Sequence, residues 1–575
     1  MVKFPPALLF ILGALFIPPL PRLIRGPLLL LLPLFVLWQL FHLPSGSLTT
    51  WNFLGYRLLL LQVDRLSLLF GYIFVIMAFI GLLYSLHIKE RGEQGAALLY
   101  IGSALGVVFA GDLFSLFLFW EMMAASSCFL IWYRREPRAL RAGFRYLLFH
   151  LFGGCLLLTG IILHYLERGS LAVGPLSPSG LSSWLMMIGF AVNAAVPPLH
   201  PWLPDAYPEG TITGSVFLTA YTTKSAVYIL ARTCAGWDVL MWAGAVMALY
   251  GVIFAIMEEE IRRLLSYHIV SQVGYMVCGV GIGGSMGING AVAHAFCHIL
   301  YKALLFMGAG AVIHLTGKGR FDDLYGRSLW RVMPLVLVLY LIGGLSISGA
   351  PLFNGFVSKS MVVASASGRG GGWIEAMLVL ASVGTFFSTT LKLPYLTWFG
   401  KGEGTPSLEG PHLNMILGMS VAALLCVILG VWPSLLYNLL PFPVEYNPYT
   451  THHLIESLSL LSGTAVAFLL LLRWIRPHPS ITLDVDWFYR RLALKIKGFS
   501  SGPLREGEGV IQGYISSLLT FLSRSMENPL WLIFPKERAE RYRRRWRANL
   551  LSLGPLLGLL SLFLYAIFWL FLFAQ

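Results

Sequence analysis

Long apolar runs decide what this chain can fold into, because runs of about 17–25 residues recur from its beginning to its end. A lipid bilayer offers no hydrogen bonds to the backbone, so a segment that crosses it must be a helix or part of a closed barrel. Hydrophobic residues make up 57% of the chain and charged residues 12%, which is typical of membrane helices. The sequence therefore predicts an all-α polytopic membrane protein with about 14–16 transmembrane helices.

One apolar run, Ala291–Ala311 (AVAHAFCHILYKALLFMGAGA), carries three titratable residues. His294, His298 and Lys302 are spaced i, i+4 and i+8, which places their side chains on one face of a helix. A charge at the bilayer centre costs at least roughly 2.5–3.5 kcal/mol, so packing alone does not account for them. A single lysine that reaches for the membrane surface is the alternative, but it leaves the two aligned histidines unexplained. The spacing therefore predicts a line of polar side chains buried inside the protein.

Another titratable group lies inside an apolar run at Glu121, in the segment FSLFLFWEMMAASS. A carboxyl group that is buried alone stays protonated, whereas a cationic neighbour allows it to ionise. Movement of that neighbour would release or capture a proton. The alternative is a structural glutamate that is hydrogen-bonded to a nearby serine or to the backbone. We favour a proton-exchanging role for Glu121.

Two regions interrupt the helical pattern with proline and glycine. The first joins Met186–Val196 to Ile212–Ala231 through PPLHPWLPDAYPEGT, and Lys224 lies in its second half. The second, SISGAPLFNGFVSKSM, leads into a short helix that carries Lys359. Proline breaks a helix, and non-helical backbone at membrane depth must be buried in protein or line a cavity. The residues expected at the helix breaks are Pro197, Pro198, Pro204, Pro351 and Gly355.

The two interrupted regions are similar, because each combines a short helix, a Gly/Pro interruption and a longer helix with an internal lysine. Paired breaks of this kind indicate an inverted-repeat transporter with its ion path at the breaks. We therefore predict two inverted five-helix repeats, each containing a broken helix. The predicted alignment matches Glu121 with Lys302, Lys224 with Lys392, and Asn193 with Lys359.

The predicted organisation divides the chain into six parts. They are N-terminal transmembrane helices (1–95), a first repeat (96–258), a second inverted repeat (259–435), an additional transmembrane helix (436–475), a polar basic segment (476–548) and a C-terminal transmembrane helix (549–575). In the basic segment, one predicted amphipathic face would lie along the membrane or a neighbouring subunit; it is formed by Ile511, Ile515, Leu518 and Leu522. The run KERAERYRRRWR is more typical of a contact with lipid headgroups or a partner than of a nucleic-acid site.

Three smaller expectations concern processing, loops and cofactors. The first apolar run, Pro5–Leu20, lacks a small-residue cleavage site, so we expect no cleaved signal peptide. Residues Arg134–Arg145 are expected to form an arginine-rich loop. The six cysteines are scattered and lack the spacing of iron–sulfur or zinc ligands. We therefore expect this chain to hold no cofactor and no metal.

Six motifs follow one another between about Ala97 and Gly400: FWE with Glu121, PPLHPWLPDAYPE, TTKSAVYILAR, EEEIRRLLSYHIVSQVGYM, HAFCHILYKALLFMGAGA and SGAPLFNGFVSK. Together they resemble the proton-translocating antiporter-like family. This family includes the large membrane subunits of respiratory complex I, of membrane-bound hydrogenases and of Mrp-type cation/proton antiporters, and the segments DAYPE and TTK are most similar to the D-type subunit of the Mrp antiporters. The resemblance implies a proton pathway through Glu121, Lys224, His294, His298, Lys302 and Lys359. We expect Lys392 to extend the same row.

Asn193 departs from the pattern of this family. The resemblance implies a lysine at this position, on the first half of the first broken helix, and asparagine cannot carry a proton. Either the first half works through Glu121 and Lys224 directly, or it is degenerate. A third hypothesis is that the Asn193 amide oxygen coordinates a cation, because hard cations take oxygen ligands.

The predicted function is a proton-translocating membrane subunit of a multisubunit Na⁺ or K⁺/proton antiporter in a bacterial or archaeal plasma membrane. The alternative is a proton-pumping subunit of a complex I-like NADH:quinone oxidoreductase or a membrane-bound hydrogenase, with the redox step in other subunits. A third hypothesis is a structural subunit that has lost transport; Asn193 supports it, whereas Lys302 and Lys359 count against it. In each case we expect partner membrane subunits and a lipid bilayer, no nucleic acid, and no enzyme activity of this chain on its own.

Overall fold

The computed structural model describes residues 4–53, 56–399, 410–475, 477, 483–488 and 491. The chain divides into one compact unit of Met1–Trp51 with Leu58–Thr482 and a second of Asn52–Arg57 with Leu483–Gln575. All helices named below belong to the first unit. The predicted amphipathic helix (511–522) and the predicted last span (550–572) lie outside the described residues.

Helices dominate the described part of the chain, and eleven of them are long and apolar enough to cross a membrane. They are α2 (Arg22–Phe41), α3 (Arg65–Tyr84), α4 (Arg91–Phe109), α5 (Leu113–Trp132), α6 (Pro137–Arg168), α11 (Asp238–Met257), α12 (Ile261–Ile282), α13 (Gly284–Thr316), the segment Arg369–Trp398, α19 (Leu413–Val431) and α21 (Thr451–Leu471). Three shorter apolar helices are α1 (Pro6–Phe16), α7 (Leu181–Asn193) and α15 (Pro334–Ser348). The prediction of an all-α polytopic membrane protein is confirmed.

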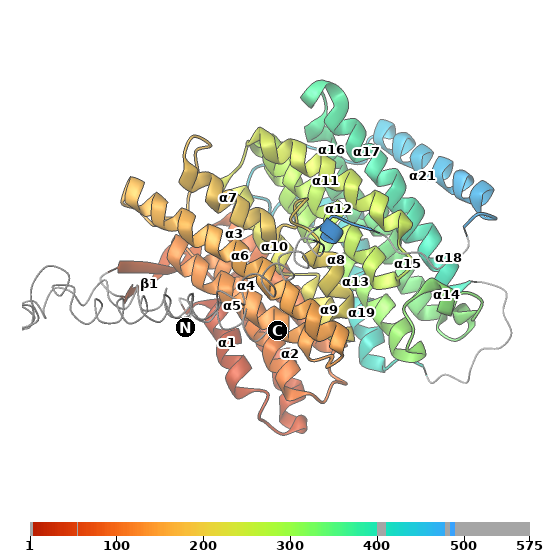
Figure 1. Ribbon diagram of the computed structural model, residues 1–575, viewed down its shortest axis with the longest axis horizontal. Coiled ribbons are helices and arrows are strands. Elements are labelled where there is room, and N and C mark those ends of the chain that lie inside the picture. Colours follow the sequence, from red (N-terminus) through yellow and green to blue (C-terminus); the bar gives the residue numbers. More distant parts are fainter. Residues whose placement is uncertain are drawn as a thin grey trace, which may run out of the picture. The chain divides into compact units, whose positions relative to one another are not determined.

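Helices α12 and α13 form the interior of the first unit. Their most apolar windows are 100% and 94% buried, whereas that of α21 is only 11% buried. In Figure 1, α13 (green) lies among α9 (Ile212–Leu218), α12, α15 and α19, and it contacts each of them. Polar side chains on α12 and α13 therefore face protein and not lipid, which is where intramembrane ionisable residues are tolerated.

A small sheet interrupts the otherwise helical order. Strands β1 (Gly46–Phe53) and β2 (Tyr56–Val63) pair between α2 and α3, and the sequence analysis does not predict them. The Leu59 N–H donates to Asp112 Oδ2 at 2.6 Å, and the Ser115 N–H donates to Asp112 Oδ1 at 2.7 Å. One carboxylate thus caps the start of α5 and also fixes strand β2 beside it.

The predicted arginine-rich loop at 134–145 is wrong beyond Glu136, because α6 begins at Pro137. Proline fits the first turn of a helix, where an N–H group has no intrahelical acceptor to lose. Arg145 therefore lies within α6 and forms a bidentate pair with Asp205, with Nε–Oδ2 at 2.6 Å and Nη2–Oδ1 at 2.9 Å. Asp205 belongs to α8 (Trp202–Ala206), so the pair ties α6 to the first broken region.

The first break follows α7, which ends at Asn193. Pro197 and Pro198 lie in the turns after α7, whereas Pro204 lies inside α8 and does not interrupt a helix. A 3-10 turn, η1 (Tyr207–Glu209), then leads to α9. A further interruption, which the sequence analysis does not predict, separates α9 from α10 (Thr222–Thr233) and places Lys224 in the first turn of α10.

The second break lies between α15 and α16 (Asn354–Ala366). Gly349 ends α15 in the left-handed conformation, with φ 73°, and Pro351 follows in the connection. Gly355 is the second residue of α16, and its hydrogen in place of a side chain permits a close approach between the two half-helices. A Cβ atom at this position would lie 1.7 Å from the carbonyl oxygen of Ser346.

Replacing Gly355 with alanine should destabilise the protein, because the clash is with backbone and neither half-helix can move freely. Overpacking of this kind costs about 1–3 kcal/mol. The matched control is Gly463→Ala on α21, where an added Cβ meets no atom within 4 Å. The thermal midpoint of the detergent-solubilised protein should fall for Gly355→Ala and stay near that of the parent protein for Gly463→Ala. Equal midpoints for the two variants would contradict the close approach.

The order of the elements favours a different repeat boundary from the predicted one. The structure contains two separate segments in the first interrupted region. One consists of α7 and α8, and the other of α9 and α10, whereas the sequence analysis counts all four helices as one broken segment. The broken segment becomes the fourth of five in both halves if one repeat runs from α4 to α10 and the other from α11 to α18 (Leu393–Trp398). Lys224 then still corresponds to Lys392, but Glu121 on α5 corresponds to α12 and not to Lys302.

Candidate functional site

Helix α13 places His294, His298 and Lys302 in the interior, as the i, i+4, i+8 spacing predicts. All three side chains are fully buried. Both ring nitrogens of His298 and the Nζ atom of Lys302 have no hydrogen-bond partner among the described residues. The nearest interaction of Lys302 is with the Phe306 ring, whose centroid is 5.9 Å from Nζ. Burying an ammonium group without a hydrogen-bond partner destabilises the folded protein. The charged form of Lys302 is therefore the least stabilised of the buried lysines in this region.

The other three buried lysines are held by carbonyl groups at the C-terminal ends of helices. Lys224 Nζ donates to Thr219 O at 2.6 Å, after α9, and Lys359 Nζ donates to Ile347 O at 2.9 Å, near the end of α15. Lys392 Nζ donates to Ile256 O at 2.8 Å, near the end of α11. The last carbonyls of a helix lack intrahelical donors, and the helix dipole favours a cation there. The ends of these helices therefore create the sites that hold the three lysines.

The titratable residues of the first half and those of the second half come close together at Lys224. This lysine on α10 lies close enough to Lys302 and His298 on α13 for their charges to interact. Its Nζ atom also donates to Thr223 Oγ1 at 3.0 Å. Because two ammonium groups repel each other, protonation of one disfavours protonation of the other.

A hydrogen-bond network continues from α13 toward the second break. His294 Nδ1 lies 3.1 Å from Ser358 Oγ, and His294 Nε2 lies 3.2 Å from Gln272 Oε1. Ser358 is adjacent to Lys359, whose Nζ donates to Ser382 Oγ at 3.3 Å. The chain of side chains thus runs from α13 to α16 and then to α17 (Trp373–Thr385).

Lys359 lies at the wall of an open cavity of about 320 Å³. The cavity is bounded by α16, α17 and α21, and its titratable lining residues are Lys359, Glu375, His452, His453 and Glu456. His452 and Glu456 are well exposed, and their side chains lie 3.9 Å apart. Polar groups therefore line a passage from the buried lysine to the surface of the first unit.

Lys392 has a different environment from the rest of the row. Its Nζ atom pairs with Glu259 Oε1 at 3.1 Å, and both side chains are at least nine-tenths buried. It belongs to a π-helical segment, η4 (Phe386–Lys392), next to Pro394. Single π-helical turns inside α-helices occur often at functional sites. His268 on α12 reaches this segment, with Nε2 2.7 Å from Ser388 Oγ.

Removing Lys392 should destabilise the protein strongly, because Lys392→Met leaves Glu259 buried without its cation. Breaking a buried pair by removing one partner costs roughly 3–5 kcal/mol. The double variant Lys392→Met/Glu259→Gln should recover much of that loss in a thermal unfolding measurement. The control Lys318→Met breaks an exposed contact of 3.8 Å with Asp323 and should change stability by less than about 1 kcal/mol.

If Lys392 also carries protons, as its place in the predicted row implies, the double variant should assemble but transport poorly. Additive effects of the two single substitutions on stability would contradict the buried pair. Full transport by the stable double variant would remove Lys392 from the proton pathway.

Glu121 has no cationic partner among the described residues. Its Oε1 atom is buried and has no hydrogen-bond partner. The carboxylate lies against Gly154 of α6, where an added Cβ would be only 2.0 Å from Oε1. The described residues therefore do not supply the cationic neighbour that would allow Glu121 to ionise.

Asn193, the position that departs from the family pattern, faces a histidine that the sequence analysis does not select. Asn193 Oδ1 lies 2.8 Å from His150 Nδ1, and both side chains are buried. The amide oxygen that would have to coordinate a cation is thus already engaged. His150 lies in an apolar run without a distinguishing local motif, so only its tertiary neighbours identify it. His268 lies within the motif EEEIRRLLSYHIVSQVGYM, but the sequence analysis does not select it as a site residue.

A cluster of hydroxyl groups lies between this region and Lys224. Tyr100 Oη is 2.7 Å from Thr222 Oγ1, and Tyr146 Oη is 2.7 Å from Ser127 Oγ. Tyr146 and Tyr207 both lie close to Tyr100 and Thr222. Tyr146 additionally contacts the His150 ring, at 4.1 Å between centroids. Hydroxyl groups both donate and accept hydrogen bonds, so the cluster can relay protons toward Thr223 and Lys224.

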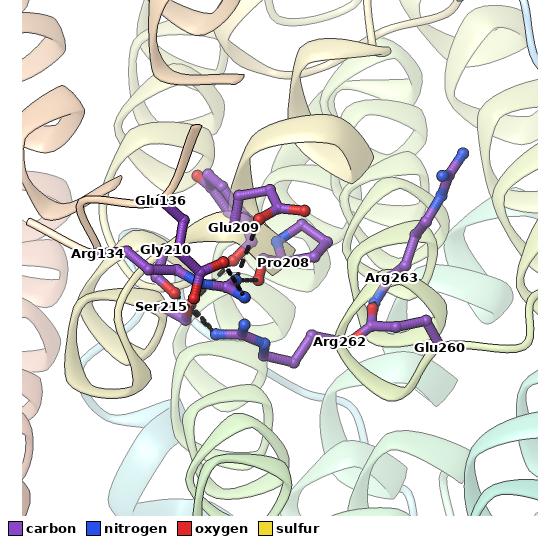
Figure 2. Close-up of polar contacts among 10 residues, drawn as sticks. Arg134, Glu136, Pro208, Glu209, Gly210, Ser215, Glu260, Arg262 and Arg263 are labelled. Carbon is purple, nitrogen blue, oxygen red and sulfur yellow. Dashed lines mark hydrogen bonds and ion pairs between the residues drawn. The ribbon is translucent and has the colours of Figure 1, made fainter. Parts of the chain in front are cut away.

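Figure 2 shows a cluster of charged residues in which the start of α12 contacts the first broken region. Arg262, at the start of α12, donates through Nη1 to Gly210 O at 2.9 Å and to Ser215 Oγ at 3.1 Å. Arg134 binds Pro208 O at 3.1 Å and pairs with Glu209 at 3.1 Å. The guanidinium groups thus satisfy carbonyls that the break after α8 leaves without helical partners.

The described residues contain no group of three His, Cys, Asp or Glu side chains placed to hold a metal ion. The convergent groups are lysines, histidines, single carboxylates and hydroxyls. Groups of this kind bind and release protons.

A family model described as NADH:quinone oxidoreductase/Mrp antiporter, TM matches residues 110–388. The Na(+)/H(+) antiporter subunit A1 of Staphylococcus haemolyticus is 29% identical over 475 residues, covering 72% of this chain and 58% of that protein. The NADH-quinone oxidoreductase subunit N of Desulforudis audaxviator is 33% identical over 369 residues, covering 58% of this chain and 72% of that protein. The fold is similar to a structure of the Mrp complex from Dietzia sp. DQ12-45-1b, with a TM-score of 0.73 and 23% identity, covering 92% of this chain and 63% of that chain.

The chain therefore spans less than two thirds of the antiporter subunit A1 and of the matched chain of the Mrp complex. The antiporter relative is an A-type subunit, so the comparisons establish the family and not the resemblance to the D-type subunit. The matched region extends from the start of α5 to η4 and includes both broken regions, and the likeness to subunit N covers most of that protein. The chain belongs to the NADH:quinone oxidoreductase/Mrp antiporter transmembrane family.

Proposed function

We propose that this chain is a proton-translocating membrane subunit of a hetero-oligomeric Na⁺ or K⁺/proton antiporter in a bacterial or archaeal plasma membrane. The observation that supports this function best is Lys302, a buried lysine without a hydrogen-bond partner at the centre of a row of titratable side chains. A structural lysine would be expected to have a partner, because an unpaired buried charge is destabilising. A lysine that alternates between charged and neutral forms is consistent with this environment.

Proton movement begins in this proposal with the first half. A proton on Glu121 passes through intervening water and the hydroxyl cluster around Thr222 to Lys224. Charging Lys224 disfavours a proton on Lys302, because two ammonium groups close enough for their charges to interact repel each other. The proton on Lys302 then moves on through His298 and His294. Each transfer changes the charge at one site and thereby the proton affinity of the next.

The second half offers a route out. His294 and Ser358 lead to Lys359, and Lys359 borders the cavity with Glu375 and Glu456. A proton released there reaches the surface of the first unit. An opposing Na⁺ or K⁺ flux would draw on the membrane potential, which supplies about 2.3 kcal/mol per charge for each 100 mV. Lys392 with Glu259 would serve as a side branch through His268 and Ser388.

The alternative function is a proton-pumping subunit of a redox-driven complex. The 33% identity to an NADH-quinone oxidoreductase subunit N favours it. In that case the same row would be driven by electron transfer in other subunits, and the chain would have no enzyme activity on its own. Among antiporter subunits, the DAYPE and TTK segments favour a D-type role.

The two functions are separated by what drives the proton movement. The chain would be expressed with its neighbouring subunits in cells that lack other cation/proton antiporters, and everted vesicles would be assayed with a ΔpH-sensitive dye. Dissipation of ΔpH on addition of Na⁺ or K⁺, without an electron donor for this complex, would support the antiporter. Proton uptake that requires NADH, hydrogen or another donor and ignores the cation would favour the redox-driven complex.

A further inference from the structure

His150 lies in α6 and contacts residues on both sides of the first break. Its side chain is 1% exposed, and its ring contacts Tyr146 at 4.1 Å and Trp202 at 4.6 Å between centroids. Its Nδ1 atom is 2.8 Å from Asn193 Oδ1, at the last residue of α7. The histidine is thus held from three sides, by α6 itself, by α7 and by α8.

The hydrogen bond to Asn193 determines how the ring can work. An amide oxygen only accepts hydrogen bonds, so Nδ1 of His150 carries the hydrogen and Nε2 carries a free lone pair. Nε2 has no hydrogen-bond partner among the described residues. A neutral imidazole of this tautomer can take up a proton at Nε2, become an imidazolium ion and release the proton again. Asn193 orients the ring throughout, because its own charge never changes.

The position of His150 connects Glu121 with the hydroxyl cluster. Gly154, which lies against the Glu121 carboxylate, is four residues after His150 on the same face of α6. Side chains at this spacing have Cβ atoms about 5–6 Å apart. On the other side, the Tyr146 ring that contacts His150 belongs to the cluster around Thr222, which leads to Lys224.

We propose that His150 is the proton carrier of the first half and replaces, from the neighbouring helix, the lysine that Asn193 lacks. The proposal rests on the proton-translocating function proposed above. It removes the need for a direct transfer between Glu121 and Lys224, and it makes Asn193 a positioning residue and not a sign of a degenerate half.

Packing alone does not explain the histidine. A phenylalanine would pack against Tyr146 and Trp202 equally well and would bury no ring nitrogen. Instead, His150 Nε2 and Asn193 Nδ2 are both buried without a partner among the described residues, and a buried polar group without a partner is destabilising. Two unpartnered polar atoms at one contact indicate a site that exchanges protons through water.

The test compares His150→Gln with a matched control on the same helix, His164→Gln. His164 is also buried and also has a ring nitrogen without a partner in the described part of the chain, but it lies far along α6 from Asn193. His150→Gln should reduce ΔpH-dependent exchange in everted vesicles roughly tenfold or more and leave complex assembly unchanged. His164→Gln should keep full exchange.

A rescue separates proton carrying from structural support. The double variant His150→Gln/Asn193→Lys returns a titratable group to the same place and should regain exchange. An assembled double variant that stays inactive would overturn the proposal, because a titratable group would then not be what the site needs. If His150→Gln alone fails to assemble, the double variant is assayed instead, and assembly with exchange supports the proposal.

Lys302→Ala, assayed in parallel, distinguishes this inference from the function on which it rests. Full exchange by His150→Gln, together with loss of exchange by Lys302→Ala, would overturn the role of His150 and leave the function standing. Full exchange by Lys302→Ala would reject the proposed proton pathway itself.

Discussion

Replacing Lys302 with alanine should lower proton transport at least roughly 100-fold while the complex still assembles. Lys302 is the buried lysine that the described residues leave without a hydrogen-bond partner, and its charge interacts with those of Lys224 and His298. Alanine cannot bind a proton, so the charge at Lys224 would have no neighbouring charge to displace. The electrostatic step between the two halves would be lost.

Assembly should survive this substitution because no hydrogen bond to a described residue is removed. Loss of the lysine also removes the cost of burying an amine, which partly offsets the cavity that alanine leaves. Lys302→Met keeps more of the volume and should transport as poorly as Lys302→Ala. The control is Lys89→Ala, since Lys89 is an exposed residue between α3 and α4. Exchange should be measured in everted vesicles and divided by the amount of assembled complex. Normal exchange in Lys302→Ala would reject the assignment of the second half.

The line of titratable side chains on one helix and the helix breaks could be predicted from the sequence, because their causes are local. The i, i+4, i+8 spacing of His294, His298 and Lys302 fixes a common helix face wherever that helix lies, and the structure places all three in its interior. Proline and glycine likewise interrupt helices through their own backbone chemistry. These features needed no knowledge of neighbouring helices.

The partners of these residues could not be predicted, because they come from other helices. Nothing local in the apolar run around His150 announces that Asn193 lies 2.8 Å from its ring. The same holds for Glu259, which pairs with Lys392 across more than one hundred residues. Hydrophobic patterning shows that a segment is buried, but it does not show which polar atoms meet inside.

The lysines show which properties follow from the local sequence and which follow only from the folded structure. Their burial follows from the apolar runs that contain them. That Lys224, Lys359 and Lys392 each bind carbonyls at the end of a helix follows only from the folded arrangement. The predicted match of Glu121 with Lys302 stays a prediction, but it counts the interrupted region as one segment, and the order of the helices favours two.

Changing Glu121 to glutamine should abolish or strongly reduce transport with little loss of assembly. Glutamine has the shape of glutamate, so it fits the space that Gly154 leaves open, but it has no proton to release. Since Glu121 has no ion-pair partner among the described residues, neutralising it leaves no cation unpaired, and stability should change little. Glu90→Gln is a suitable control, because Glu90 is exposed and pairs at the surface with Arg135, at 3.3 Å.

A second variant moves the Glu121 carboxylate without changing its chemistry. In Gly154→Ala the new Cβ would lie 2.0 Å from Glu121 Oε1, so the flexible side chain must turn away from this part of α6. Transport should fall because proton transfer needs close contact between donor and acceptor, whereas the thermal midpoint should change little because only the end of a side chain moves. Normal exchange by Glu121→Gln would show that the carboxyl group is structural. Normal exchange by Gly154→Ala, together with loss of exchange by Glu121→Gln, would show that the pathway uses Glu121 in more than one orientation.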